Sequence, residues 1–373
     1  MGEEYIKDMK LLVISGINLY EGGPLSIYYD CLDALIRASV TKEYRIVAFV
    51  HSVDLFERYT DYVELIALKD SRESYLKRIR YEYFYFHEYT LENDVDIWIS
   101  LHDMTPRVKA GKLYTYCHNV SPFLRKDLSK LKYSATNVVF SYFYKYIYRI
   151  NIKAATAVIV QQDWMRKAFL KMFPVKNVIV ARPNVQVDFV SRETEIRNQK
   201  TIFAYASVPR YFKNFEVICE ACSKMDRDDF EVWLTIDGTE NKYSQEVKKK
   251  YSDVKCIKWI GLQPRQKLFD IYNQIDCFIF PSFMETWGLP ISEFKLTGKT
   301  MLLADVLYAY EALGNYEKVV FFEPADADML SRRMGEVIDG TIEYMPQTEQ
   351  VLGEPFARDW DELIQLLIDG TGK

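Results

Sequence analysis

The sequence predicts an α/β fold made of two doubly wound units with parallel sheets. Short, continuous apolar runs recur along the chain, helical patterns lie between them, and a polar stretch near the middle interrupts the series. A run that is apolar at every position, rather than at alternate positions, is typical of a strand covered on both faces. Because strand and helix patterns alternate throughout, we expect parallel sheets.

The apolar runs are rich in Val, Ile, Phe and Tyr. In the first half they are 10–16, 45–51, 96–102, 112–118 and 156–162, and in the second half 201–207, 231–237, 256–261, 277–282, 300–305 and 319–324. The helical pattern is clearest where apolar residues recur at spacings of three and four, as in Leu25, Tyr28, Leu32, Leu35 and Ile36.

A turn followed by a charged stretch, "NVQVDFVSRETEIRNQK" at 184–200, separates the two series of strands. We therefore expect an N-terminal domain over residues 1–190 and a C-terminal domain over residues 191–355. Ligands of doubly wound sheets bind at the carboxyl ends of the strands, so the cleft between the two sheets is the expected ligand site.

Composition indicates a globular protein. The 373 residues are 49% hydrophobic and 27% charged, and no run approaches the roughly 20 apolar residues that span a bilayer. The start "MGEEYIKDMK" lacks the basic-then-apolar order of a signal peptide, so we expect a cytoplasmic protein. In that reducing compartment the six cysteines are expected to be buried thiols. Cys219 and Cys222 form a C-x-x-C within a helical pattern, without a second pair, which favours structural thiols over a metal or redox site.

The most informative stretch is "PSFMETWGLPISEF" at 281–294. It follows a buried strand, and Pro290 suits the first turn of a helix. Residues Thr286–Leu289 are therefore expected at a strand-to-helix corner, with an exposed Trp287 and free backbone amides that suit an anion. Glu285 and Glu293, with seven residues between them, can face the same ligand.

Carboxylates beside an anion site make sense if the ligand carries hydroxyls as well as phosphates. Each carboxylate can accept two hydrogen bonds from adjacent hydroxyls. A nucleotide sugar has both kinds of group. The alternative is that Glu285 is a solvated residue of the loop and that Glu293 only interacts favourably with the dipole of the helix.

This stretch resembles the nucleotide-sugar motif of the retaining glycosyltransferases of family 4, which have the two-domain GT-B fold. The frame P-S-x-x-E-x-x-G-L-P is complete in Pro281, Ser282, Glu285, Gly288, Leu289 and Pro290, and Glu293 follows. The resemblance implies that Glu285 holds donor-sugar hydroxyls and that Glu293 holds the ribose hydroxyls. It also implies that the amides of Trp287, Gly288 and Leu289 contact the sugar and diphosphate.

Two cations follow the first strand of the second half in "ASVPRYFKNFEVICEA" at 206–221. At the carboxyl end of a strand, Lys213 and Arg210 can neutralise a diphosphate as charge develops on the leaving group. The family places a lysine before Asn or Gly here, as in Lys213 and Asn214. Its arginine lies five or six residues earlier, whereas Arg210 is only three residues before Lys213.

In the first half, Gly22 and Gly23 precede Pro24 and a helical pattern, where glycine lets a ligand approach the backbone. The family has a glycine-rich loop at this place. The absence of G-x-G-x-x-G weakens a nicotinamide reading.

Histidines end two of the expected strands. His118 begins the H-N-x-x-P-F stretch that in the family borders the donor sugar and the acceptor. His102 is the alternative candidate for this position, and His51 and His87 are expected to be structural. An isolated histidine at a strand end would more often be a polar terminator.

No metal is expected, although another glycosyltransferase class holds a divalent ion with D-x-D. Asp326 and Asp328 match those letters but begin a helix, where Asp caps are ordinary, and Asp94 and Asp96 precede a strand. No cofactor is expected besides the nucleotide sugar, which is a substrate.

Charge is uneven along the chain. Residues 104–182 contain 15 Lys and Arg against 2 Asp and Glu, and they include the aromatic run 141–150. A basic, aromatic segment fits a lipid-linked acceptor and peripheral contact with an anionic membrane. A nucleic-acid site and an ordinary solvated face are the alternatives, and no nucleic-acid motif accompanies the charge.

The last segment, 354–367, places Trp360, Leu363, Leu366 and Leu367 on one helical face after a turn-rich stretch. As in the resembling family, residues 356–373 are expected to return to the first domain.

The preferred function is transfer of a sugar, with retention, from a nucleoside diphosphate sugar to a saccharide or lipid-linked saccharide, in surface polysaccharide biosynthesis. A nucleotide-sugar isomerase of the same fold and a non-catalytic sugar-nucleotide- or partner-binding protein are the alternatives. Donor sugar, base, acceptor and oligomeric state lie beyond the sequence.

Overall fold

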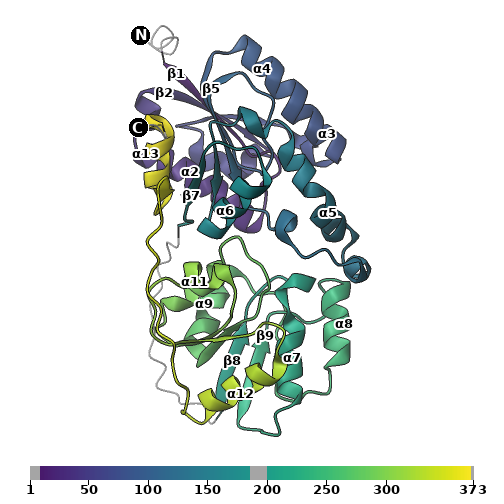
Figure 1. Cartoon of the computed structure of the whole chain (residues 1–373). Helices are drawn as coiled ribbons and strands as arrows, with labels where there is room; N and C mark the ends of the chain where they lie inside the picture. Colours follow the sequence, from purple (N-terminus) through teal and green to yellow (C-terminus); the bar gives the residue numbers. More distant parts are fainter. Residues whose placement is uncertain (1–8, 185–199, 371–373) are drawn as a thin grey trace. The chain divides into compact units, whose positions relative to one another are not determined.

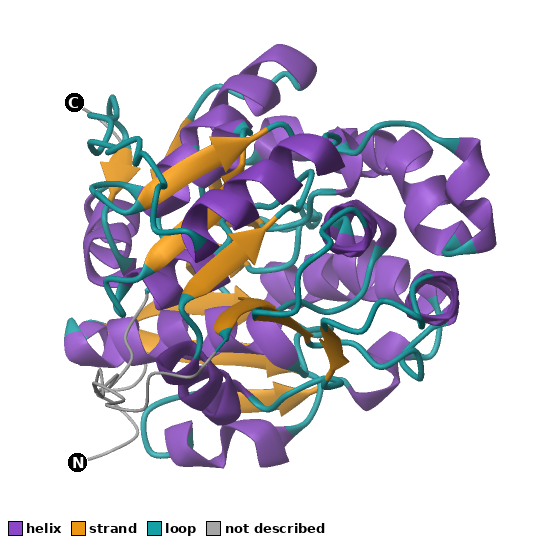
Figure 2. Ribbon diagram, turned by 90° about the horizontal axis from the view of Figure 1, so that it is seen from below, coloured by secondary structure: helices purple, strands orange, loops and turns teal. Residues whose placement is uncertain are grey.

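Parallel strands form two separate sheets in the computed structural model, which describes residues 9–184 and 200–370 (Figure 1). Among these residues, two compact units can be distinguished. The first consists of 9–122, 143–184 and 352–370, and the second of 123–142 and 200–351. Helices lie on both sides of the strands, as the predicted α/β class requires (Figure 2).

The first sheet has eight strands in the order β14-β7-β6-β5-β4-β1-β2-β3, all parallel. Its strands are β1 Lys10–Ser15, β2 Tyr44–Val50, β3 Glu64–Ala67, β4 Val95–Ser100, β5 Ala110–Cys117, β6 Ala157–Val160, β7 Val178–Ala181 and β14 Phe356–Ala357. Its helices are α2 Gly22–Arg37, α3 Tyr75–Arg80, α4 Phe86–Glu92, α5 Ala135–Arg149, α6 Asp163–Met172 and α13 Trp360–Asp369, with a π-helical turn over Tyr81–Tyr85. Residues 135–142 of helix α5 group with the second unit and residues 143–149 with the first.

Apolar side chains cover both faces of this sheet. On one face, Ile14, Ile46 and Ile99 pack with the buried side of α2. On the other, Phe49 and Trp98 pack with Phe86 of α4. Burial on both faces explains why the strands read as continuous apolar runs.

The C-terminal segment belongs to the first unit. β14 pairs with β7, placing Phe356 opposite Val180. The buried side of α13 packs beside α2, where Trp360 stacks on Tyr116 at a centroid distance of 5.3 Å (Figure 1).

The second sheet has six parallel strands in the order β10-β9-β8-β11-β12-β13. The strands are β8 Thr201–Tyr205, β9 Phe230–Leu234, β10 Ile257–Trp259, β11 Cys277–Phe280, β12 Thr300–Ala304 and β13 Val319–Phe322. The helices are α7 Phe215–Ser223, α8 Lys242–Lys250, α9 Arg265–Gln274, α10 Leu289–Lys295, α11 Leu307–Leu313 and α12 Ala327–Ile338.

The two units divide the chain at other residues than the expected 1–190 and 191–355, and residues 352–355 group with the first unit. Residues 123–142 group with the second unit, because Lys132 forms a 2.8 Å ion pair with Glu246 and Tyr133 packs edge-on against Tyr243 of α8. The boundary expected at 184–200 falls almost entirely on residues 185–199, which lie outside the described residues. Among the described helices, none combines the length and apolar character needed to cross a bilayer.

Candidate active site

Glu285 lies in a loop that leaves the buried strand β11 and enters the short helix α10. Gly288 precedes α10 with a φ of 96°, a left-handed conformation that favours glycine. A Cβ atom there would also lie 3.3 Å from Ile291 Cδ1. The backbone conformation therefore requires the glycine of the motif, the space for a side chain is tight, and Pro290 occupies the first turn of α10 as expected.

Hydrogen bonds tie this loop to helix α11 and to residues 210–214. Tyr308 donates its hydroxyl to the Ser282 carbonyl at 2.5 Å, and the Phe283 amide donates to the Phe212 carbonyl at 2.9 Å. Asn214 has a left-handed φ of 57° and donates through Nδ2 to the carbonyls of Pro281, at 3.1 Å, and Pro324, at 2.7 Å. These bonds hold two loops that are distant in sequence side by side.

Lys213 and Glu285 meet at this junction. Lys213 Nζ lies 2.5 Å from Glu285 Oε1, and the two side chains are 16% and 14% exposed. Tyr205, buried in β8, fixes the backbone of Lys213 by donating to its carbonyl at 2.9 Å. A cation and a carboxylate thus sit together at the carboxyl ends of β8 and β11, and each neutralises the other.

Glu293 lies on α10 with a side chain only 6% exposed. Arg265, the first residue of α9, reaches it with Nη2 2.9 Å from Oε1, although Arg265 itself is half exposed. Burial raises the pKa of the Glu293 carboxyl, and the Arg265 guanidinium opposes that rise. The second carboxylate of the motif is therefore also paired with a cation.

Trp287 is buried rather than exposed, with 6% of its surface accessible. Its indole Nε1 donates to Ser292 Oγ at 3.0 Å, and Ser292 Oγ donates to the Ala312 carbonyl at 3.0 Å. The expected exposure was wrong because the indole turns back onto helix α10, where it reaches Ser292. Its neighbours Thr286 and Leu289 are half-buried.

Arg210 is exposed at the start of the 3₁₀ turn Tyr211–Lys213. Its carbonyl accepts from the Lys213 amide at 2.8 Å, while its side chain forms no ion pair with any residue of 9–184 or 200–370. The structure therefore joins Arg210 to Lys213 through the backbone.

In the first unit, His118 follows β5 and is nearly buried. Its amide donates to Asp103 Oδ1 at 2.9 Å, and its Nε2 lies 3.8 Å from Asp103 Oδ2. Asp103 has a left-handed φ of 66° and also accepts from the Tyr148 hydroxyl at 2.9 Å. Burial lowers the pKa of the His118 imidazole below its ordinary 6.5, while Asp103 opposes the shift.

His102, the alternative histidine, is fully buried in a network of polar contacts. Its Nε2 lies 2.8 Å from Glu82 Oε1, and Arg78 Nη2 lies 2.9 Å from its Nδ1 and 2.8 Å from its carbonyl. This network joins the helical segment 75–92 to the end of β4. Because both ring nitrogens face partners, His102 is engaged in holding the fold.

Gly22 and Gly23 are the first two residues of α2. Gly22 has a left-handed φ of 61°, and a Cβ atom on either residue would meet nothing within 4 Å. The backbone at the start of α2 therefore faces open space, and only Gly22 is required by its conformation.

The D-x-D matches have structural partners. Asp326 caps α12 by accepting from the Met329 amide at 2.8 Å, and Asp328 lies 2.9 Å from Lys224. Asp96 accepts from the Leu11 amide at 2.8 Å. Within the described part of the chain, no group of three His, Cys, Asp or Glu side chains is placed to hold a metal.

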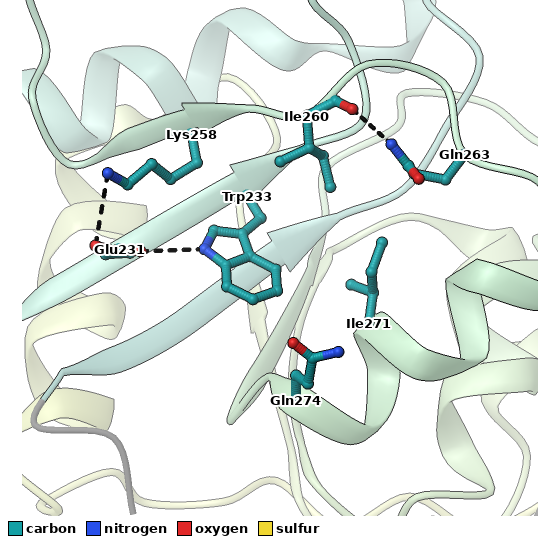
Figure 3. A pocket seen from close by; sticks show the side chains of 7 residues that line it. All are labelled: Glu231, Trp233, Lys258, Ile260, Gln263, Ile271 and Gln274. Atoms are coloured by element: carbon teal, nitrogen blue, oxygen red, sulfur yellow. Dashed lines mark hydrogen bonds and ion pairs between the residues drawn. The ribbon is translucent and has the colours of Figure 1, made fainter.

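A hollow of about 430 Å³ lies elsewhere on the second unit, between the face of β9 and β10 and helix α9 (Figure 3). Glu231 sits beside it, 3.2 Å from Trp233 Nε1 and 3.8 Å from Lys258 Nζ. Ile271 and Gln274 of α9 complete its wall, and none of the residues predicted for the site lines it.

Three residues of these arrangements were not found from the sequence. Asn214 was noted only as the neighbour of Lys213, although an Asn before a helix is a known candidate for a left-handed position. Asp103 stands next to His102 in "SLHD", which is a signal of a polar strand end. Arg265 gives no signal, because only the fold brings it to Glu293.

The chain resembles known proteins in sequence and in fold. Residues 186–350 match the sequence profile of the family "Glycosyl transferases group 1". A glycosyltransferase from Rickettsia africae ESF-5 has a TM-score of 0.62 and 14% identity, and the match covers 89% of each chain. WaaG, a glycosyltransferase involved in lipopolysaccharide biosynthesis, has a TM-score of 0.64 and 12% identity over 88% of this chain and 90% of that chain. Anabaena Alr3699/HepE in complex with UDP and glucose has a TM-score of 0.58 and 13% identity over 89% and 90%. A search of curated proteins gives no match.

Proposed function

We propose that this chain, which has the GT-B fold and matches the group 1 glycosyl transferases over residues 186–350, transfers a sugar from a nucleoside diphosphate sugar to an acceptor. The acceptor is a saccharide or a lipid-linked saccharide, and the anomeric configuration is retained. The HepE structures contain UDP, glucose or UDP-glucose, which supports a donor of this class.

The pairing of Lys213 with Glu285 is the observation that carries this proposal. Both side chains are about 85% covered, yet each interacts mainly with the other across 2.5 Å. A donor can replace both partners at once, because its diphosphate is an anion for Lys213 and its sugar hydroxyls are donors for Glu285. A ligand with only phosphates would leave Glu285 unpaired beside an anion.

Glu293, one turn into α10, is likewise paired with a cation, Arg265, that a donor group can replace. The ribose of the donor offers adjacent hydroxyls that can donate to the buried Glu293 carboxylate, where Arg265 now lies at 2.9 Å. The amides of Trp287, Gly288 and Leu289 and the side chain of Thr286 are proposed to contact the sugar and diphosphate.

The first unit is proposed to contribute His118, Gly22 and Gly23. The pKa of His118 is lowered by burial, so the imidazole is neutral near pH 7 and can exchange hydrogen bonds with sugar hydroxyls. The open space at Gly22 and Gly23 lets phosphate or acceptor groups approach the backbone.

In the proposed reaction, the bond between the anomeric carbon and the diphosphate oxygen breaks while a bond to the acceptor oxygen forms on the same face. The acceptor hydroxyl gives its proton to the departing diphosphate. Lys213, and Arg210 beside it, stabilise the negative charge that develops there. Because this positive charge comes from side chains, the reaction is proposed to be independent of metal and of any cofactor.

We further propose a cytoplasmic protein that works in surface polysaccharide biosynthesis, at the inner face of the membrane. Support comes from the likeness to WaaG, a glycosyltransferase involved in lipopolysaccharide biosynthesis.

Thermal unfolding of the full chain with a panel of nucleoside diphosphate sugars tests the proposal, because a ligand that binds the folded state raises its stability. One donor should protect the protein and then release nucleoside diphosphate in the presence of acceptor extracts. No protection by any donor would contradict the proposal. A rearranged sugar formed without acceptor would instead identify an isomerase.

A further inference from the structure

One face of strand β9 is incompletely covered in the part of the second unit that the structure describes. Every residue of β11 and β13 is buried, as a parallel strand covered on both faces requires. β9 lies inside the same sheet, between β10 and β8, yet its residues alternate between buried and half-buried. The half-buried residues are Glu231 and Trp233, whose side chains point to the same face because they are two positions apart.

The hollow of about 430 Å³ lies over this face (Figure 3). Lys258 of β10 is the register partner of Trp233, so its side chain projects from the same side of the sheet. Ile271 and Gln274, one turn apart on α9, form the opposite wall. Pockets that bind small molecules have volumes of roughly 300–1,000 Å³, so the hollow is large enough for such a ligand.

The polar groups of the hollow are loosely paired. Glu231, whose side chain is 24% exposed, accepts from Trp233 Nε1 at 3.2 Å, and its Oε1 lies 3.8 Å from Lys258 Nζ. Gln274 donates through Nε2 to the Asp270 carbonyl at 3.1 Å, and its Oε1 can accept. Glu231 and Lys258 are the charged residues of the lining, and their charges compensate each other. The hollow therefore offers both donors and acceptors without a net charge.

We infer that this hollow binds an uncharged saccharide. The carbon-bound hydrogens of a sugar ring form an apolar face, which can pack on the indole of Trp233 and remove apolar surface from water. The hydroxyls of the sugar can donate to Glu231 and accept from Lys258, bridging the 3.8 Å between them. An anionic ligand would meet the Glu231 carboxylate, and a purely apolar ligand would bury two charges without hydrogen bonds.

The hollow is distinct from the proposed donor site. None of the residues assigned to the donor lines it. Arg265, which pairs with Glu293, begins α9, whereas Gln274 ends it, and these residues are separated by roughly 14 Å along the helix axis. The inference rests on the proposed function in one respect, since the saccharide would be the acceptor or the product chain of the transfer. A second sugar site would then hold that chain on the enzyme.

Saturation-transfer NMR of the full-length chain tests the inference, with short uncharged oligosaccharides of glucose, galactose or N-acetylglucosamine as probes. At least one probe should bind the wild-type chain. Trp233→Ala and Glu231→Ala should each lower its affinity about tenfold or more, since they remove the stacking surface and the hydroxyl acceptor. Lys213→Ala, which alters the proposed donor site, should leave probe binding unchanged.

Trp259→Ala is the matched control, because Trp259 is also half-buried but follows Lys258 on β10 and points to the other face of the sheet. It should bind the probe as the wild-type chain does. If Trp233→Ala lowers the unfolding temperature, Gln274→Ala tests the same hollow at an exposed position and should also weaken binding.

Protection against unfolding by a nucleoside diphosphate sugar, measured on the same variants, should persist in Trp233→Ala. Saccharide binding and donor binding are thus measured separately, and either can fail alone. The inference is overturned if no probe binds the wild-type chain, or if Trp259→Ala or Lys213→Ala weakens binding as much as Trp233→Ala does. It is also overturned if Trp233→Ala instead dissociates a dimer of the chain, because the hollow would then be a contact between two copies.

Discussion

Removing Lys213 should destabilise the second unit by leaving a charge uncompensated. Breaking one partner of a fully buried ion pair costs about 3–5 kcal/mol. Lys213 and Glu285 keep 16% and 14% exposure, so water reaches part of the site and we expect about 1–3 kcal/mol for Lys213→Ala. Adding Glu285→Gln removes the unpaired charge, so the double variant should recover most of that loss.

Hydrogen exchange of peptides from β8 and β11, the strands that lead to the two side chains, measures this cost locally. The double-mutant cycle should give a coupling free energy of about 1–3 kcal/mol. The ion pair of Lys224 and Asp328, with 36% and 68% exposure, is the control and should couple by less than about 1 kcal/mol. Equal coupling free energies in the two pairs would refute the reasoning that burial makes Lys213 and Glu285 depend on each other more strongly than Lys224 and Asp328 do.

Four further predictions concern pH, metal and the C-terminal helix. Because the pKa of Glu293 is raised above 4.5, stability should fall as pH rises from 4.5 through the raised pKa, and Glu293→Gln should flatten that part of the curve in unfolding experiments. The pKa of His118 is lowered, so stability should instead fall as pH drops below 6.5, and a His118→Asn variant with the same slope as wild type would contradict this. Sugar transfer should persist in the presence of a chelator. Activity that the chelator abolishes and that magnesium or manganese restores would contradict the proposed independence of metal. Trp360→Ala should lower the free energy of unfolding of the first unit by about 3–5 kcal/mol, because a fully buried ring that stacks on Tyr116 is lost. Protection of the second unit by the donor should persist, and Trp360→Phe should be tolerated.

Much of the fold follows from the apolar runs, because a parallel strand buried on both faces must be apolar throughout. Every run named as a strand overlaps one in the structure, and Leu25 to Ile36 lie on α2. Three strands of the structure lie outside those runs, and one of them, β7, is as apolar and buried as the strands that were named. The other two have physical reasons to be less visible. β3 is a partly exposed edge strand of four residues, and β14 has two residues that pair only with β7.

The positions of the candidate site residues were predictable where the path of the backbone sets them. Pro290 and Gly288 fix the corner before α10, and the carboxyl ends of neighbouring strands bring Lys213 to Glu285. Side-chain partners were not predictable, because they depend on tertiary packing. Sequence spacing could not show that Trp287 turns inward or that Arg265 reaches Glu293 from another helix.

Titration calorimetry of the full-length chain with nucleoside diphosphate sugars tests the central claim most directly. The account predicts that one donor binds the wild-type chain and that Lys213→Ala and Glu293→Ala each weaken it by about tenfold or more, since each removes a hydrogen bond to a charged group. Leu170→Glu, far in sequence from both residues, should bind the donor as wild type does. A donor that binds all four proteins with equal affinity would contradict the assignment of this site.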